Sequence, residues 1–160
     1  MGKIVIVGSG PAGCSAALYA ARAGQEVVVI SMGMGALSKA ELIQNYYGFE
    51  EGITGAELYR QGVAGAKAVG AEFITAEVVG LDYTGSLVVQ TTEGDYPADA
   101  VILATGAGRI APKIAGLAEH EGRGVSYCAT CDAFFYRGKT AAVLGSGEYA
   151  LHEVQALLPL

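Results

Sequence analysis

Residues 3–13 of the chain read Lys-Ile-Val-Ile-Val-Gly-Ser-Gly-Pro-Ala-Gly. The β-branched residues at positions 4–7 predict a short buried strand. The glycines after it predict a tight turn, and the small residues from Pro11 to about Ala23 predict a helix that begins at a proline. A second β-branched strand is expected at residues 25–31. Strand, helix and strand in this order indicate an α/β fold built on a parallel sheet.

The glycines of this turn, Gly8, Gly10 and Gly13, have the spacing G-x-G-x-x-G. In a dinucleotide-binding turn the first glycine allows the sharp bend, the second lets backbone N–H groups approach a pyrophosphate, and the third lets helix and strand pack closely. An ordinary glycine turn can have the same letters, but the position between a strand and a helix favours cofactor binding. The acid that usually ends the second strand and holds a ribose is replaced by Ser31, whose hydroxyl lacks a carboxylate's paired acceptors.

The composition excludes several classes of protein. The chain has 160 residues, of which 52% are hydrophobic and 16% charged, and its net charge is −6. A disordered chain would be less hydrophobic, and a negative surface would repel phosphate backbones, so nucleic acid is not an expected partner. Residues 4–21 carry no charge, but Gly8 and Pro11 interrupt them, so neither a signal peptide nor a membrane span is expected. We expect a soluble, cytoplasmic protein.

Further strands and helices are expected along the rest of the chain. Thr54-Gly-Ala-Glu57 has capping-box spacing and predicts a helix to about Val69, after a long loop at residues 32–53 with one helical turn. Strands are expected at residues 72–83, 86–92 and 98–104, with turns at 84–85 and 93–95. Residues 139–144, 145–147 and 148–158 repeat the strand–turn–helix order. The repeat predicts the start of a second nucleotide-binding unit.

Two cysteines lie close together in Cys128-Ala-Thr-Cys131, and Asp132 follows them. Cysteines at this spacing at a helix start can close a small redox-active disulfide, and the N-terminal one gains thiolate stabilisation from the helix end. Asp132 is placed to move a proton as the pair opens and closes. The alternative is half of a zinc site, which needs two more ligands, and the chain offers only one further cysteine and two histidines. We therefore expect no metal site, and we expect Cys14 to be a packed core thiol.

Four stretches of the chain, in this order, closely resemble the low-molecular-weight thioredoxin reductases: residues 8–13 (GSGPAG), 102–107 (ILATGA), 122–132 (GRGVSYCATCD) and 145–150 (GSGEYA). Enzymes of that family bind FAD in a discontinuous Rossmann-like domain and carry the cysteine pair on an inserted NADPH domain. The resemblance therefore implies an FAD-binding domain at residues 1–112 and the start of an NAD(P)-binding domain at residues 113–160. Because the family is about twice as long and usually dimeric, it also implies the N-terminal half of a longer homodimeric enzyme.

The resemblance implies roles for individual residues. Cys131 would exchange electrons with the flavin, Cys128 would attack the disulfide of a thioredoxin-like partner protein, and Asp132 would act as acid and base. The residues implied to lie at the cofactors are Gly8, Gly10, Pro11, Ala12, Gly13, Ser31, Asn45, Val78, Ala104, Thr105 and Gly106 for FAD, and Gly145 and Gly147 for NADPH.

Several positions depart from the family's pattern, three of them at expected cofactor contacts. Ser31 replaces a ribose-binding glutamate, Ala36 replaces a flavin-contact glutamine, and Tyr149 replaces a small serine near the NADPH phosphates. A phenol at position 149 would crowd the pyrophosphate of NADPH. Because some relatives take electrons from reduced ferredoxin, NADPH and ferredoxin are alternative electron donors for this chain. A third possibility is a flavin-binding module without catalysis. We expect the 160 residues alone to be inactive with NADPH, because they lack a complete nicotinamide site.

Overall fold

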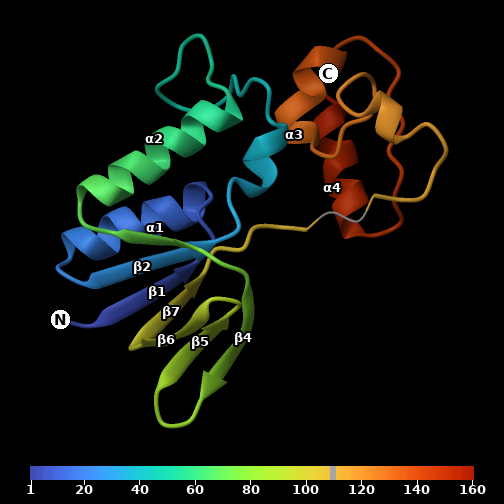
Figure 1. Ribbon diagram of the computed structural model, residues 1–160. Coiled ribbons are helices and arrows are strands. Elements are labelled where there is room, and N and C mark those ends of the chain that lie inside the picture. Colours follow the sequence, from blue (N-terminus) through green and yellow to red (C-terminus); the bar gives the residue numbers. More distant parts are fainter. Residues whose placement is uncertain (109–110) are drawn as a thin grey trace. The chain divides into compact units, whose positions relative to one another are not determined.

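The computed structural model describes residues 1–108 and 111–160, and the chain divides into two compact units after Gly108 (Figure 1). The first unit is an α/β unit, as expected. Its elements, in order, are β1 (Lys3–Val7), α1 (Pro11–Arg22), β2 (Glu26–Ser31), a 3-10 turn (Gly35–Lys39), α2 (Gly55–Ala68), β3 (Glu72–Thr75), β4 (Val78–Tyr83), β5 (Leu87–Thr91), β6 (Gly94–Ala98) and β7 (Ala100–Leu103).

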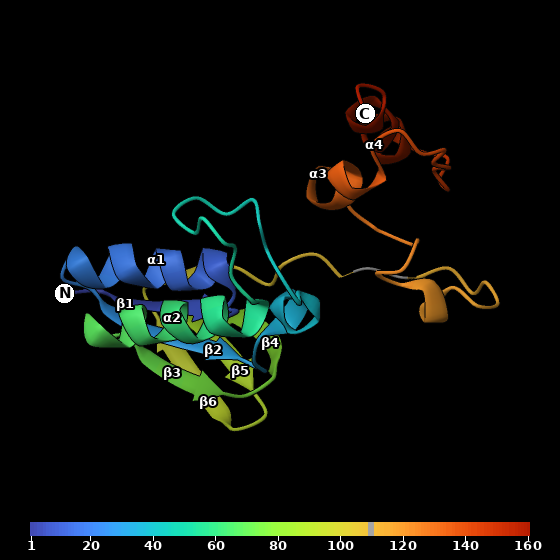
Figure 2. The same ribbon diagram turned by 90° about the horizontal axis from the view of Figure 1, so that it is seen from above.

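The centre of the first unit is a four-stranded parallel sheet with the order β3-β2-β1-β7. Helices α1 and α2 lie side by side over one face of this sheet (Figures 1 and 2). A three-stranded antiparallel sheet with the order β4-β5-β6 lies beyond the other face. The parallel strands are therefore covered on both sides, which explains why they read as unbroken apolar runs.

Alternate residues of the central strands face opposite layers. Val5, Val7, Val28 and Ile30 belong to a buried cluster with residues of the antiparallel sheet. Their neighbours in sequence face the helices instead, in a second cluster made of Ile6, Val27 and Val29 with Ala17, Ala66 and Ala71. The period-two alternation of a strand places successive side chains on opposite faces, so one short strand contributes to both cores.

The turn from β1 to α1 depends on the absence of side chains at two glycines. Gly8 has a φ of +108°, a conformation that side chains disfavour, and its N–H donates to the Ile30 carbonyl at 2.8 Å. A Cβ on Gly13 would lie against the Gly8 carbonyl oxygen, far inside van der Waals contact. Helix α1 therefore begins immediately beside the end of β1, as predicted for this turn.

The expected single strand at residues 72–83 is wrong. The structure divides it into β3, which pairs with β2, and β4, which pairs with β5 in the other sheet. The chain changes sheets at Ala76, which is buried and whose N–H donates to the Ser31 carbonyl at 3.3 Å. Both segments are rich in strand-forming residues, so their composition did not reveal the crossing between them.

Residues 93–95 were expected to be a turn, but β6 begins inside that stretch, at Gly94. Glycine and aspartate are typical of turns, and Pro97 also counts against a strand because proline has no N–H to donate. The sheet order explains how β6 forms: among the described strands it pairs with β5 alone, at the edge of the small sheet. An edge strand tolerates a proline, and the following strand β7 starts only at Ala100.

The second unit holds a 3-10 turn (Ala118–His120), α3 (Ala129–Asp132), a second 3-10 turn (Ala133–Tyr136) and α4 (Glu148–Leu157). The helices expected near residues 128–132 and 148–158 are confirmed, but the strand expected at residues 139–144 is wrong. Those residues are irregular and exposed. A strand needs a hydrogen-bonded neighbour, and no described residue of this unit supplies one.

Among the described residues, no helix has both the length and the apolar character that a membrane crossing requires.

We predict that Gly13→Ala lowers the free energy of unfolding by about 2 kcal/mol or more, because the new methyl group must displace the backbone of the β1–α1 turn. Urea unfolding followed by circular dichroism measures this change. Gly10→Ser is the matched control, since a side chain there meets open space and serine is a favoured helix N-cap. Equal stabilities for the two variants would contradict the close packing at Gly13.

Candidate functional site

The predicted cofactor residues of the first unit gather at one edge of the parallel sheet. Strands β1, β2 and β7 run parallel, so their carboxyl ends meet there and carry Gly8, Ser31 and Ala104. Ala104 donates its N–H to the Val7 carbonyl at 2.8 Å, and Thr105 and Gly106 follow it, both exposed. The strand order reverses between β1 and β7, and ligands of such sheets bind outside the carboxyl ends at that point.

Helix α1 presents open backbone N–H groups at this edge. Gly10 is its N-cap, Pro11 and Ala12 are exposed in its first turn, and no side chain caps that turn in the described chain. The first turn also contains no acidic residue. A Cβ on Gly10 would meet nothing within 4 Å. An uncapped helix N-terminus next to open space favours an anionic group such as a pyrophosphate.

A cavity of about 190 Å³ lies beside this turn, between α1, α2 and the loop after β2. Its walls are partly apolar, and Ser9 and Tyr59 contribute polar atoms. Pockets that enclose a whole small-molecule ligand usually measure about 300–1,000 Å³. The cavity is therefore large enough for only a part of a dinucleotide. It is lined by Ser9, Gly10, Pro11, Cys14, Ser15, Leu18, Leu37, Tyr46, Leu58, Tyr59 and Gly62.

Three hydroxyl groups meet at the end of β2. The Ser9 side chain is 1% exposed, and its Oγ lies 2.7 Å from Ser31 Oγ and 3.1 Å from the Tyr59 hydroxyl. Ser9 Oγ also donates to the Gly33 carbonyl at 3.3 Å. Ser31, which stands where a ribose-binding acid is usual, therefore belongs to a cluster of uncharged hydroxyl groups. Sequence reasoning did not identify Ser9 or Tyr59, since Tyr59 is 50 residues from Ser9 and no local pattern links them.

Cys14 is a core thiol, as expected. It is 4% exposed and its Sγ donates to the Ser9 carbonyl at 3.1 Å. Burial raises the pKa of this thiol above its usual value. The protonated form is therefore favoured at neutral pH, and a protonated buried thiol is a poor nucleophile.

The two remaining predicted FAD residues lie away from the turn in sequence. Asn45 is exposed on the loop that an isolated bridge between Ile43 and Ile53 closes. Val78, at the start of β4, is half-buried and packs against the core cluster on the antiparallel side of the sheet. Their roles at a cofactor stay predictions.

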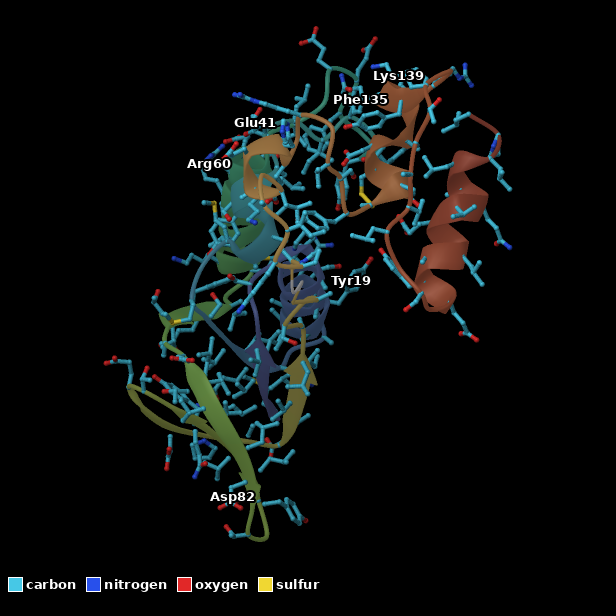
Figure 3. The ribbon with its side chains drawn as sticks, turned by 90° about the vertical axis from the view of Figure 1, so that its right-hand side faces the viewer. Tyr19, Glu41, Arg60, Asp82, Phe135 and Lys139 are labelled. Carbon is cyan, nitrogen blue, oxygen red and sulfur yellow. A yellow bond between two sulfur atoms is a disulfide. The ribbon has the colours of Figure 1, made fainter. Side chains whose placement is uncertain are left out.

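In the second unit, Cys128 and Cys131 form the disulfide that the sequence predicted, with a Cα–Cα separation of 5.3 Å (Figure 3). Cys128 is the N-cap of α3, and its Sγ accepts the Cys131 N–H at 3.2 Å. Cys131 is exposed and Cys128 half-buried. The Asp132 carboxylate accepts the Ser126 hydroxyl at 2.5 Å. The pair is therefore accessible for thiol–disulfide exchange.

No cluster of three histidine, cysteine or acidic side chains suited to a metal ion occurs among residues 1–108 and 111–160.

The second glycine turn differs from the first. Gly147 is the N-cap of α4 without a side-chain cap, but a Cβ on Gly145 would lie 2.7 Å from that of Ala150. Glu148 brings a negative charge into the first turn of the helix, and the Tyr149 side chain is 67% exposed. A carboxylate at a helix N-terminus competes with a phosphate for the same positive potential. This turn is therefore less suited than the first to a pyrophosphate.

Comparisons with known proteins agree with these features. A family model described as pyridine nucleotide-disulphide oxidoreductase matches residues 2–158. A thioredoxin reductase of Streptomyces coelicolor is 40% identical over 97% of this chain, and a bifunctional thioredoxin reductase/thioredoxin of Mycobacterium leprae is 46% identical over 94%. The chain covers 50% and 34% of these relatives.

A solved thioredoxin reductase of Streptococcus pyogenes is similar over 98% of this chain, at 36% identity and a TM-score of 0.86. The chain covers 52% of that structure. It therefore spans about half the length of most of the relatives it matches.

We predict that Ser9→Ala lowers the free energy of unfolding by about 1–2 kcal/mol, because it removes the shared partner of two hydroxyls. Tyr59→Phe should cost less than about 1 kcal/mol, since Ser9 keeps Ser31 and the Gly33 carbonyl. Chemical denaturation of both variants gives the comparison. A larger loss for Tyr59→Phe than for Ser9→Ala would show that Ser9 is not the centre of the cluster.

Proposed function

Because the chain belongs to the pyridine nucleotide-disulphide oxidoreductase family, we propose that it is the FAD-binding and disulfide-bearing part of a thioredoxin reductase. The family implies a flavin cofactor. The observation that carries the proposal is that one chain holds both an uncapped β1–α1 glycine turn and a Cys128–Cys131 disulfide. The first feature suits a dinucleotide, and the second suits two-electron exchange with another protein disulfide.

The first unit has the residues to hold FAD. The N–H groups of the first turn of α1 would bind the pyrophosphate, in the open space beside Gly10. Thr105 and Gly106 would border it from the end of β7. Ser31, held by Ser9, would offer a hydroxyl to the ribose in place of a carboxylate. A single hydroxyl binds a ribose less strongly than a carboxylate with two acceptor oxygens.

The cysteine pair would carry the electrons onward. Bound FAD supplies a two-electron carrier. Reduction of the disulfide consumes two electrons and two protons and leaves two thiols. Cys128 gives up its proton, which Asp132 would accept, and its thiolate then attacks one sulfur of the partner's disulfide. This attack forms a mixed disulfide and releases the other sulfur as a thiolate. Cys131 attacks Cys128, re-forms the pair and releases the partner as a dithiol. Asp132 would give a proton to the leaving thiolate.

The electron donor is NADPH in the leading form of the proposal. A specific observation favours the alternative, a reduced protein such as ferredoxin. Glu148 places a negative charge at the N-terminus of α4, and Tyr149 is exposed beside it, so the second glycine turn is poorly suited to the phosphates of NADPH. The homodimer that the resemblance implies and the cytoplasmic location expected from the sequence stay predictions.

We predict that the 160-residue chain retains FAD on gel filtration and that Gly10→Ser weakens FAD affinity at least about tenfold, which is about 1.4 kcal/mol. The serine hydroxyl would cap the N–H groups that the pyrophosphate needs. Flavin absorbance of the eluted protein measures retention, and a fluorescence titration measures affinity. Unfolding of the same variant provides the control, because its stability should be unchanged. No flavin on the wild-type chain, or equal affinity for the variant, would contradict the proposed site.

Reduction by NADPH is tested on the flavin-loaded 160-residue chain. We expect dithionite to bleach the flavin absorbance and NADPH not to do so, because these residues alone lack a complete nicotinamide site. Bleaching by NADPH would contradict this expectation and would show that the second glycine turn functions.

The roles of the two cysteines are tested with single variants. A thioredoxin that retains one active-site cysteine, activated as a mixed disulfide with thionitrobenzoate, releases a coloured thiolate when attacked. We expect Cys131→Ser, which retains Cys128, to release it at least about tenfold faster than Cys128→Ser, because Cys128 accepts an N–H that stabilises its negative charge. Cys131 is the more exposed of the two residues. Faster release by Cys128→Ser would therefore show that exposure determines which cysteine attacks, and it would reverse the two roles.

A further inference from the structure

Glu153 is a carboxylate that contacts the backbone of the cysteine turn. It lies on α4, its side chain is 13% exposed, and Oε2 accepts the Ala129 N–H at 2.5 Å. Ala129 is the residue directly after Cys128 and is itself buried. Helices α3 and α4 lie side by side in both ribbon views (Figures 1 and 2). The Glu153 carboxylate on α4 is thus fixed beside the Ala129 N–H at the start of α3.

The hydrogen bond alone does not require a charge. An N–H at the start of a helix has no partner within the helix, so a neutral amide or hydroxyl oxygen would satisfy it equally well. A carboxylate that is largely out of water pays a desolvation cost that a neutral acceptor avoids. The placement of a charged acceptor there suggests an effect on the reaction of the cysteines as well as on the packing of the helices.

Other side chains near the cysteine turn also carry charged or titratable groups. Asp132, on α3, accepts a hydrogen bond from Ser126. On α4, His152 Nδ1 lies 3.9 Å from Glu153 Oε1, but the His152 side chain is 71% exposed. Water therefore weakens the electrostatic contact between these two side chains without abolishing it.

The charge acts differently on the two redox states. The disulfide is neutral. The dithiol formed from it by two electrons and two protons loses one proton readily, and the thiolate on Cys128 is held by the Cys131 N–H. A second negative charge at the neighbouring peptide repels that thiolate, and the repulsion is stronger where water is partly excluded. The negative charge therefore favours the disulfide over the dithiol.

We propose that Glu153 is a positioning residue for the cysteine pair, which fixes the turn through Ala129 and, by its charge, shifts the pair toward the disulfide. A pair shifted in this way is a stronger reductant when it is reduced, since it gives up its electrons more readily to another disulfide. The inference deepens the proposed function and rests on the cysteine pair being its redox centre.

The test uses the 160-residue chain in mixtures of reduced and oxidised dithiothreitol. One dithiothreitol loses two hydrogens to become a cyclic disulfide, and the protein disulfide becomes a dithiol. We expect Glu153→Gln to shift this equilibrium about three- to tenfold toward the dithiol at pH 7.5, or about 15–30 mV at about 30 mV per tenfold change. The pH at half-maximal alkylation by iodoacetamide should fall by about 0.5–1 unit. Glu148→Gln, which removes an exposed charge from the same helix, should change neither.

Two further variants separate charge from packing. Glu153→Asp keeps the charge and should stay near the wild-type equilibrium. His152→Lys adds a positive charge beside Glu153 at an exposed position, so it should fold and shift the equilibrium about twofold toward the dithiol. Wild-type values for both Glu153→Gln and His152→Lys would overturn the proposal, as would equal shifts for Glu153→Gln and Glu153→Asp. If Glu153→Gln does not fold, the His152→Lys result decides alone. Neither readout needs FAD, a nicotinamide or a partner protein, so a failure of the proposed reductase function is recognised separately.

Discussion

The close approach between the Gly8 carbonyl and Gly13 is the constraint on which the rest of the first unit depends. It brings the start of α1 directly to the end of β1, so the helix can lie along the sheet and bury Ala17 against Ile6 and Val29. Within the same turn, Gly10 is the N-cap of α1, and no side chain caps the N–H groups of the first helical turn. The packing of this turn and the proposed pyrophosphate site therefore lie in one short glycine segment of the backbone.

The hydroxyl cluster at the end of β2 follows from this turn. Because Gly8 donates its N–H to the Ile30 carbonyl, Ser9 is directed into the interior beside Ser31 and Tyr59. Three hydroxyl groups hydrogen-bond to one another at the position where a dinucleotide-binding fold usually has a carboxylate. The proposed FAD site therefore carries less negative charge than one with a carboxylate at this position, and it depends on α2 for Tyr59.

The two glycine turns of the chain have similar sequences but different structural surroundings. The first follows a strand that has neighbours on both sides. The second follows irregular residues and begins a helix with Glu148 in its first turn. The turn that holds the cysteine pair contacts that helix through the hydrogen bond from the Ala129 N–H to Glu153. In the second unit, α4 thus reaches the cysteine turn through a side chain in the middle of the helix.

How much of the protein could be predicted depends on whether the signal was local. Residues 3–31 contain a period, a proline at the helix start and glycines at required positions, and the structure there matches the prediction at nearly every boundary. The disulfide was also predictable, because two cysteines three positions apart are close in any helical turn. The division of residues 72–83, the edge strand β6 and the irregular residues 139–144 were not, since each depends on which strand lies alongside.

By itself, therefore, the sequence determined the α/β class, the glycine turn and the cysteine pair, because backbone conformation and spacing along the chain suffice for them. Only the tertiary structure decided that Ser9, Ser31 and Tyr59 share hydrogen bonds and that Glu153 reaches Ala129. Those contacts join residues more than 20 positions apart. They exist because packed layers bring separate elements within hydrogen-bond distance, which no local pattern records.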